Sequence, residues 1–417
     1  MSANDRRYLL NIRRIGGAGN MVIPNTDSGY AAYAKARGAL AIPRKQLVSI
    51  PNTDFALHPA LAPLAAFKMA VILNIGTLIQ PVTKKDIAAG APLPSQRFSH
   101  SDQTRQWDLA TADDSGGAGW GGRIADYFLP KSKAALPMCI GVDRLSLFAN
   151  GANAAQYVVG SEGAAIADIL TNPRTSALAN ALLKSAQAGP EHVRRIGAIN
   201  EAAVKFSAIY NKGTTSGGPV ATPFPRDQFK QLSELGRQLF ELAHYLRADP
   251  FIEPAGSRKV LHALQGGNDS HDTEAGHIPS LNADLAGNLA AFLAEMGAQG
   301  NLDRMLVLVT TEFGRSLTGN NGLAAEKSGS DHAWGNNILA FGAVKPGAYG
   351  TPAELALGGP MDVSSNGLLI PTTSVDQLAA TATRWFGVPD ADLPALFPNL
   401  KNFAKADLGF APVTPAA

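Results

Sequence analysis

The stretch RMLVLVTTEFG (residues 304–314) gives the clearest β-strand signal in the chain. Its apolar run is unbroken and passes directly into a polar turn, which is typical of a strand buried on both faces of a parallel sheet. Upstream, leucines, a phenylalanine and a methionine recur at steps of three and four between residues 281 and 296. That spacing predicts an amphipathic helix. A helix followed by a buried strand favours the α/β class.

Three other apolar runs extend this pattern, and we predict that each is a strand: MAVILNIGTLI (69–79), KVLHALQGG (259–267) and NNILAFGAV (336–344). Strand, helix, strand and strand in succession predict an α/β fold with a largely parallel sheet between helices and right-handed crossovers. Because such a sheet binds ligands beyond the carboxyl ends of its strands, polar residues at those ends are the first place to search for a site.

The middle of the chain is predicted to be helical from about residue 160 to 250, with one helix at 227–247 and a loop at 211–225. We interpret it as a helical insertion, at about 160–258, in a single α/β domain that runs from residue 21 to 417.

Composition excludes several classes of protein. The chain has 417 residues, a formal net charge of +2 and 45% apolar residues, so it is globular and shows no basic stripe for nucleic acid. No run of about 18 apolar residues is present, so no membrane span is predicted. The single cysteine, Cys139, lies in an apolar run, so a buried and inert thiol is expected.

The first twenty residues are atypical. NDRRYLLNIRR (4–14) is similar to the twin-arginine start of an exported protein, but IGGAGNMVIPN (15–25) follows without the apolar stretch that such a signal needs. We therefore expect no strand here. Either the protein is cytoplasmic with a basic start, or residues 1–20 are the remnant of a signal.

The stretch GGNDSHDTEAGH (266–277) is the richest cluster of possible metal ligands. Asp269 and His271 lie just past a predicted strand, and His277 follows within about two helical turns. Carboxylate oxygen and imidazole nitrogen are common ligands of zinc and manganese. A polar loop that caps the next helix explains the same residues equally well, because aspartate, serine and threonine are favoured caps.

Two more clusters are expected at the same edge of the sheet. SDHAWGN (330–336) holds the pair Asp331 and His332, which is either a second ligand pair or an ordinary surface pair. TTEFGRS (310–316) places Glu312 and Arg315 directly after the clearest strand. These two form either a structural ion pair or, alternatively, an oxyanion clamp with a carboxylate that supports the metal ligands.

The stretch RFSHSDQTRQWD (97–108) offers a possible nucleophile, Ser99 or Ser101, at the start of a helix. Backbone amides and the positive end of the helix dipole favour an attacking oxyanion there. The alternative is an ordinary helix N-cap. The glycines of GGAGWGGRIAD (116–126) suggest a dinucleotide site, but no strong strand precedes them and no acidic residue is placed to bind a ribose, which disfavours an oxidoreductase.

Taken together, these motifs resemble the bacterial family named domain of unknown function 1501, within the alkaline-phosphatase and sulfatase-like superfamily. The resemblance rests on FSHSDQTRQW, GWGGRIADY, GGNDSH, TEFGRS, SDHAWGNN and TSVDQLAATATRWFGV, which follow in that family's order. It implies an alkaline-phosphatase-like sheet with two divalent metals at its carboxyl edge. It also implies transfer of phosphate or sulfate from a small anionic ester through a hydroxyl nucleophile.

Carried onto this sequence, the resemblance assigns roles to individual residues. Asp269 with His271 would bind one metal and Asp331 with His332 the other, and His277 is a further possible ligand. The metals would be zinc, manganese or calcium. Ser99 is the candidate nucleophile and Arg315 the candidate clamp for the anion. The remaining set would support the ligands or bind the anion: Glu312, His100 and Arg105.

Two departures from the family pattern motivate an alternative, a catalytically degenerate member that binds a ligand or a protein. The family's first turn carries an aspartate, whereas Asn20 is the nearest polar residue here, and Trp334 stands where some relatives have a histidine. Losing a carboxylate would weaken a two-metal site. The resemblance also implies a periplasmic or exported protein, with a cytoplasmic location as the alternative because no intact signal is present.

Overall fold

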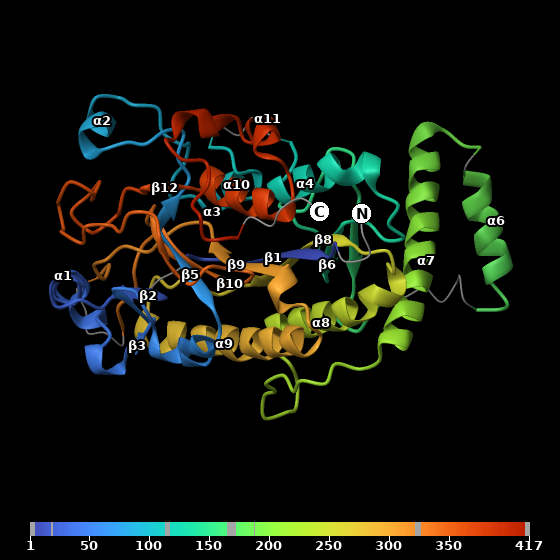
Figure 1. Cartoon of the computed structure of the whole chain (residues 1–417), viewed down its shortest axis with the longest axis horizontal. Coiled ribbons are helices and arrows are strands. Elements are labelled where there is room, and N and C mark those ends of the chain that lie inside the picture. Colours follow the sequence, from blue (N-terminus) through green and yellow to red (C-terminus); the bar gives the residue numbers. More distant parts are fainter. Residues whose placement is uncertain are drawn as a thin grey trace.

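A nine-stranded sheet forms the centre of the molecule in the computed structural model, which describes residues 5–17, 20–112, 117–164, 172–186, 188–321 and 327–412 (Figure 1). Among the described residues, every strand pairing within this sheet is parallel except the two made by β10. The predicted class, α/β with a largely parallel sheet between helices, is therefore confirmed. The order is β11 (Gly347–Tyr349), β5 (Met69–Gly76), β10 (Asn336–Gly342), β9 (Met305–Thr311), β1 (Arg7–Arg14), β8 (Arg258–Gln265), β6 (Cys139–Val142) and β7 (Gln156–Val159), with β12 (Thr373–Ser374) beside β5.

Strand β1 overturns the expectation that no strand precedes the glycine turn. It lies between β8 and β9, and seven of its eight residues are buried. The arginines of β1 disfavoured a buried strand in the sequence analysis, because arginine is almost never fully buried unless it is paired. Here the partners come from distant segments: Arg13 forms a buried 2.5 Å ion pair with Asp108, and Arg14 donates to Gln265 Oε1 over 2.9 Å.

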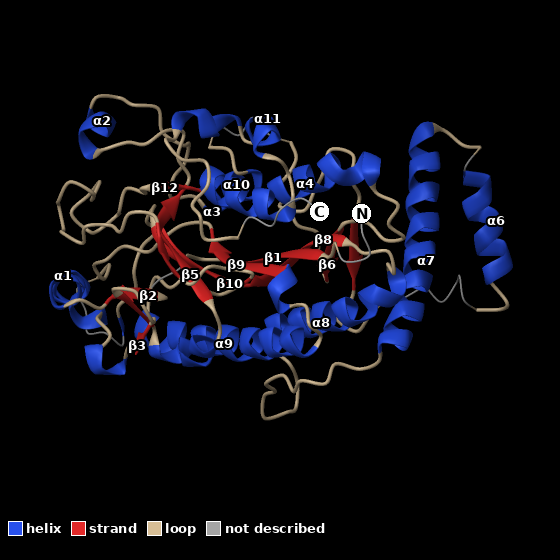
Figure 2. Ribbon diagram, in the orientation of Figure 1, coloured by secondary structure: helices blue, strands red, loops and turns tan. Residues whose placement is uncertain are grey.

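Helices cover both faces of the sheet (Figure 2). Alternate residues of β1 point to opposite faces, so Leu10 joins one core cluster and Leu9 the other. The first face carries α8 (Glu234–Ile252) and α9 (Glu274–Ala298). The second carries α3 (His100–Leu109), α4 (Trp120–Phe128), α10 (Val375–Phe386) and α11 (Leu393–Leu396).

Two helices of the predicted insertion, α6 (Ser176–Ala186) and α7 (Glu191–Gly217), lie at one end of the molecule, where α7 packs on α8. The loop predicted at 211–225 is wrong in its first half, because α7 continues through Gly217. Close helix packing explains the glycines: a Cβ on Gly213 would lie 2.3 Å from a side-chain carbon of Ile252. The helix predicted at 227–247 begins later, at Glu234, after the cap Ser233.

A smaller layer borders the main sheet. It contains the three strands β2 (Val22–Pro24), β4 (Phe55–Leu57) and β3 (Val48–Ser49), together with α1 (Asp27–Arg37); α2 (Lys84–Ala88) lies apart from it. The 3-10 helices are Gly38–Leu40, Arg44–Gln46, Pro59–Ala66, Leu129–Lys131, Leu302–Arg304, Asp390–Asp392 and Pro398–Asn402. None of the described helices is both long and apolar enough to cross a membrane.

The register of the central strands brings four loops together. Arg14, the last residue of β1, pairs with the last residue of β8 on one side and with the last residue of β9 on the other. Strand β10 is antiparallel to β9, so its first residue, Asn336, lies at the same edge. The segments that follow β1, β8 and β9 and the segment that precedes β10 therefore meet at the carboxyl edge of the sheet.

Candidate metal centre

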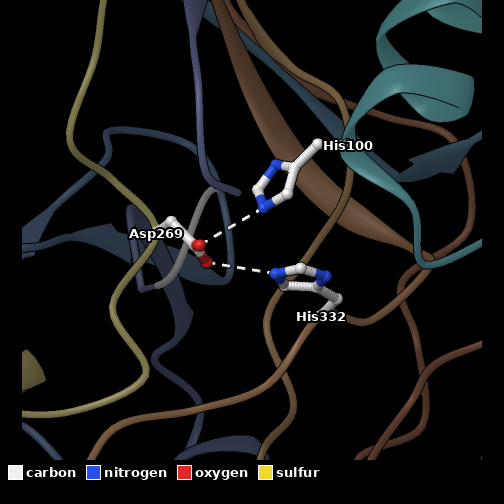
Figure 3. A group of neighbouring side chains, drawn as sticks. All are labelled: His100, Asp269 and His332. Carbon is white, nitrogen blue, oxygen red and sulfur yellow. Dashed lines mark hydrogen bonds and ion pairs between the residues drawn. The ribbon is translucent and has the colours of Figure 1, made fainter.

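Asp269 lies at the middle of this edge, four residues after the end of β8. Its Oδ1 is 2.6 Å from Arg315 Nη1 and 3.1 Å from the Nε2 atoms of both His332 and His271. Its Oδ2 is 3.2 Å from His100 Nε2. Three imidazoles and one guanidinium thus surround a single carboxylate, as Figure 3 shows for His100 and His332.

The three histidines come from different elements. His100 is the first residue of α3, His271 follows β8, and His332 precedes β10. Phe313, fully buried just after β9, packs against two of them, with ring centroids 4.3 Å from His332 and 4.9 Å from His100. The aromatic contact fixes the ring planes, so the direction of each Nε2 atom is set by the core beneath it.

Each histidine turns its other ring nitrogen toward a hydrogen-bond acceptor. His332 Nδ1 lies 2.7 Å from the carbonyl oxygen of Phe98, and His100 Nδ1 lies 2.9 Å from Glu312 Oε1. His271 Nδ1 lies 3.0 Å from Asp331 Oδ1. The carbonyl oxygen of Phe98 can only accept, so His332 Nδ1 carries a proton. His100 and His271 each lie between two carboxylates, and in the tautomer with the proton on Nδ1 their Nε2 lone pairs also face Asp269.

In that tautomer acceptors face acceptors. His271 Nε2 and His332 Nε2 are 3.0 Å apart, and neither neutral ring then has a proton there to donate. One oxygen of Asp269 and the Nε2 atoms of His100 and His332 all lie within 4.8 Å of one another. Carboxylate with imidazole fits zinc or manganese, and an outward hydrogen bond on each imidazole is the usual support for such ligands.

The charge of the central carboxylate is favoured by its neighbours. Partial burial alone would raise the pKa of Asp269, but its contacts with Arg315 and with the neighbouring histidines outweigh it and hold that pKa below its ordinary value. The side chain is 37% exposed, so an ion or a ligand from solvent can reach it. Asp269 is therefore an accessible carboxylate at neutral pH, as a metal ligand must be.

Two buried charged residues form the floor of the site. Arg315 is fixed by the carbonyl oxygen of Gly16 over 3.0 Å and by Ser330, in addition to Asp269. Glu312 is fully buried and accepts the Gly16 backbone N–H over 2.7 Å. Gly16 has to be glycine because its φ is +115° and a Cβ there would lie 2.0 Å from the Asp269 backbone nitrogen.

Glu274 and Arg37 form a second buried layer that was not assigned from the sequence. Glu274 is 3% exposed and accepts from Arg37, from the Ser330 hydroxyl and, over 3.1 Å, from Asn20 Nδ2. Asn20, at the position where a metal-binding carboxylate was expected, thus contacts Glu274. The sequence carries no signal for Arg37, because its partner is more than two hundred residues away along the chain.

The remaining predicted residues lie around the cluster. His277 Nε2 is 2.7 Å from the carbonyl oxygen of Gly267. Ser99 is the N-cap of α3, accepts from the backbone N–H of Asp102 and donates to its carboxylate over 2.5 Å. Arg105 is exposed on α3. Trp334 is buried, and its indole N–H donates to the carbonyl oxygen of Thr77 over 2.8 Å.

Comparisons with known proteins give a partial family match. The sequence model of a family described as "Protein of unknown function (DUF1501)" matches residues 233–395. That segment contains Asp269, His271, Arg315 and His332, whereas His100 lies outside it. No curated protein matches the chain.

Several solved structures are similar at low identity. One is the C-terminal periplasmic domain of EcEptC from Escherichia coli in complex with zinc, with 10% identity, a TM-score of 0.33, and coverage of 91% of this chain and 82% of that one. Another is a TAB5 alkaline phosphatase mutant with magnesium, with 10% identity, a TM-score of 0.31, and coverage of 80% and 90%. A third is the PsFucS1 sulfatase from Pseudoalteromonas sp., with 12% identity, a TM-score of 0.32, and coverage of 93% and 68%.

Proposed function

We propose that this protein is a metal-dependent hydrolase of phosphate or sulfate esters, with its metal centre at Asp269. A divalent cation bound there would supply positive charge to an ester oxygen. His100, His271 and His332 would hold it through Nε2. Asp331 and Glu312 would orient two of those rings through Nδ1.

One observation carries this proposal. Three imidazoles direct their Nε2 atoms at one carboxylate, and the Nδ1 atom of each lies against an acceptor on its far side. Groups that only accept hydrogen bonds repel one another unless a cation or a proton lies between them. A cap or a loop needs no such convergence, so the geometry favours a metal site over the polar-loop interpretation of GGNDSHDTEAGH.

Access and charge support an anionic ester as the substrate. The side chains of His271 and Asp331 are 48% and 54% exposed, so the cluster opens to solvent on that side. Arg315 offsets the negative charge of Asp269, so that carboxylate would not repel an anionic group beside the metal. The choice of an ester rests further on the resemblance of the site motifs to the alkaline-phosphatase and sulfatase-like superfamily, as does export to the periplasm.

The nucleophile remains a prediction. Ser99 precedes the metal-facing His100 directly, but its hydroxyl is engaged with Asp102 and Ser101. In this proposal Ser99 attacks the ester only after leaving that cap.

Metal content measured by elemental mass spectrometry tests the proposal. Wild-type protein, loaded with zinc or manganese and then dialysed, should retain metal, whereas Asp269→Ala and Asp331→Ala should retain less. Glu312→Gln should weaken binding by about 10–100-fold, because it changes the partner of His100 Nδ1. The exposed His192→Ala is the control and should match wild type. Equal metal in wild type and in both aspartate variants would overturn the metal centre.

Hydrolysis of p-nitrophenyl phosphate and p-nitrophenyl sulfate by the loaded protein then separates the two ester classes. Metal binding without turnover of either ester would favour the alternative, a degenerate relative that binds a ligand or protein. That alternative is motivated by Asn20, which contacts Glu274 where a carboxylate ligand was expected.

A further inference from the structure

A cavity lined in part by Arg315 adjoins the proposed metal centre. Its volume is about 90 Å³, and its lining includes Arg315, Arg37 and the asparagines Asn20, Asn74, Asn336 and Asn337. That volume accommodates several waters or a group of about six non-hydrogen atoms. Because Arg315 also contacts Asp269 over 2.6 Å, the cavity shares a wall with the proposed metal centre.

Two of these asparagines are buried and incompletely paired. Asn336 is 7% exposed and Asn74 2%, and among the described residues Asn336 Oδ1 and Nδ2 and Asn74 Oδ1 have no hydrogen-bond partner. The Nε atom of Arg37 is also without one. Unpaired buried amides destabilise a fold, so each one calls for a physical explanation. These amide atoms have almost no accessible surface, so a side-chain rotation has to present them to the cavity. A ligand that both donates and accepts hydrogen bonds would favour that rotation and pair them.

The sheet is distorted where these residues lie. Asn74 has a φ of +44°, and the pairing of β10 with β5 shifts register between Asn336 and Ile338. Bulges and left-handed residues interrupt a sheet at a cost, and they are common beside functional sites because they redirect side chains. Here the irregularity occurs at the two asparagines of the cavity wall, while the rest of β10 pairs regularly.

The charges of the cavity are already balanced within the protein. Arg37 is paired with Glu274 and Arg315 with Asp269. No unneutralised cation is therefore left in this wall to attract a second anion. The lining also has apolar residues, which include Phe55, Leu355 and Leu369. Amides together with apolar carbon suit a neutral group that carries hydroxyls on a hydrocarbon frame.

We infer that this cavity binds the neutral, hydroxyl-bearing part of the substrate, a polyol or the edge of a sugar ring, beside the metal centre. The inference rests on the proposed function, because it places this group next to the ester. The asparagine amides would donate to and accept from hydroxyls, and the apolar residues would contact the carbon atoms.

Binding of glycerol and methyl β-D-glucopyranoside, measured by saturation-transfer NMR, tests the inference. Both probes should bind wild type at millimolar concentration, and Asn336→Leu should bind them about tenfold more weakly. Asn282→Leu is the matched control, since Asn282 is equally buried with an unpaired amide but lies outside the cavity. Leu355→Trp should block binding of the probes by filling the cavity. This second variant tests the inference even if Asn336→Leu does not fold.

Each result has a definite meaning. No binding of either probe to wild type, equal binding by Asn336→Leu or Leu355→Trp, or displacement of the probes by inorganic phosphate would overturn the inference. Zinc content of the same samples separates this failure from failure of the proposed function. If the probes bind but the protein retains no zinc, the cavity binds hydroxyls and the proposed metal centre is wrong. If the protein retains zinc but the probes do not bind, the metal centre stands and the inference about the cavity is wrong.

Discussion

The two ends of β1 both carry buried charges, but they are built differently. At the amino end, Arg6 contacts Asp249 over 2.5 Å, and Tyr8 and Ser257 donate to the same carboxylate over 2.8 Å or less. Donors there face an acceptor, and Asp249 is fully buried. At the carboxyl end, Asp269 is 37% exposed and faces imidazole nitrogens that are also acceptors when neutral.

The difference separates a structural ion pair from a candidate binding site. A closed cluster with matched donors and acceptors needs nothing from solvent, and it serves to fix the chain. An open cluster with an excess of acceptors is complete only when a cation or a proton lies among them. Composition alone does not distinguish the two, because both ends combine arginine with aspartate; exposure and the direction of the donors do.

Asp249→Asn should have the largest effect on stability, because it leaves the buried Arg6 without its counter-charge. We expect a loss of about 3–5 kcal/mol in the free energy of unfolding. Asp269→Asn, measured by urea unfolding with a chelator present, should lose less than half as much, since water reaches that position. Equal losses would contradict the distinction between the two ends.

Two buried histidines predict how the free energy of unfolding changes with pH. Burial, with a smaller contribution from Arg144, lowers the pKa of His262 to about 4, and burial with Arg14 does the same for His58. In the unfolded chain both protonate near 6.5. Between these values the unfolded state binds protons that the folded state does not, so stability falls as pH drops from about 6.5 to 4.

The expected loss is about 3 kcal/mol for each of these histidines by pH 4. Melting temperatures in chelator from pH 7 to pH 4 measure it. His262→Gln should remove about half of the loss that His262 and His58 cause together, because glutamine does not titrate and still hydrogen-bonds to Gln156. The exposed His192→Gln is the control. A pH profile in His262→Gln that overlays wild type would show that His262 is not held neutral.

The local sequence pattern predicted the strands that consist mainly of apolar residues. β9 and β10 lie within the stretches 304–314 and 336–344, and α9 covers 281–296. α9 begins earlier than predicted, at Glu274, and includes Pro279. β1 was missed because the partners of Arg13 and Arg14, which are Asp108 and Gln265, are far away in sequence, and a local pattern holds no information about them.

The residues of the candidate site also fall into two groups, those whose place the sequence pattern predicted and those whose place depends on distant contacts. His271 follows β8, so the parallel topology predicted that it would lie at the carboxyl edge with Asp269. Asp331 and His332 precede a strand, and they reach the same edge because β10 is antiparallel to β9. His100 was assigned a supporting role, because a long irregular stretch separates β5 from α3 and gives no geometric constraint. Its Nε2 atom faces Asp269 only because Glu312, from another strand end, holds Nδ1.

Ser99→Ala carries the smallest expected effect and separates two roles of one hydroxyl. As the N-cap of α3, Ser99 accepts from the Asp102 backbone N–H, so its loss should cost about 1 kcal/mol of stability. Ser99→Asn restores a cap but supplies no nucleophile. If Ser99 only caps the helix, Ser99→Asn should recover both stability and ester hydrolysis in metal-loaded protein. If Ser99 attacks the ester, Ser99→Asn should recover stability while turnover stays lost, and unchanged zinc content in both variants would place the defect in the chemical step.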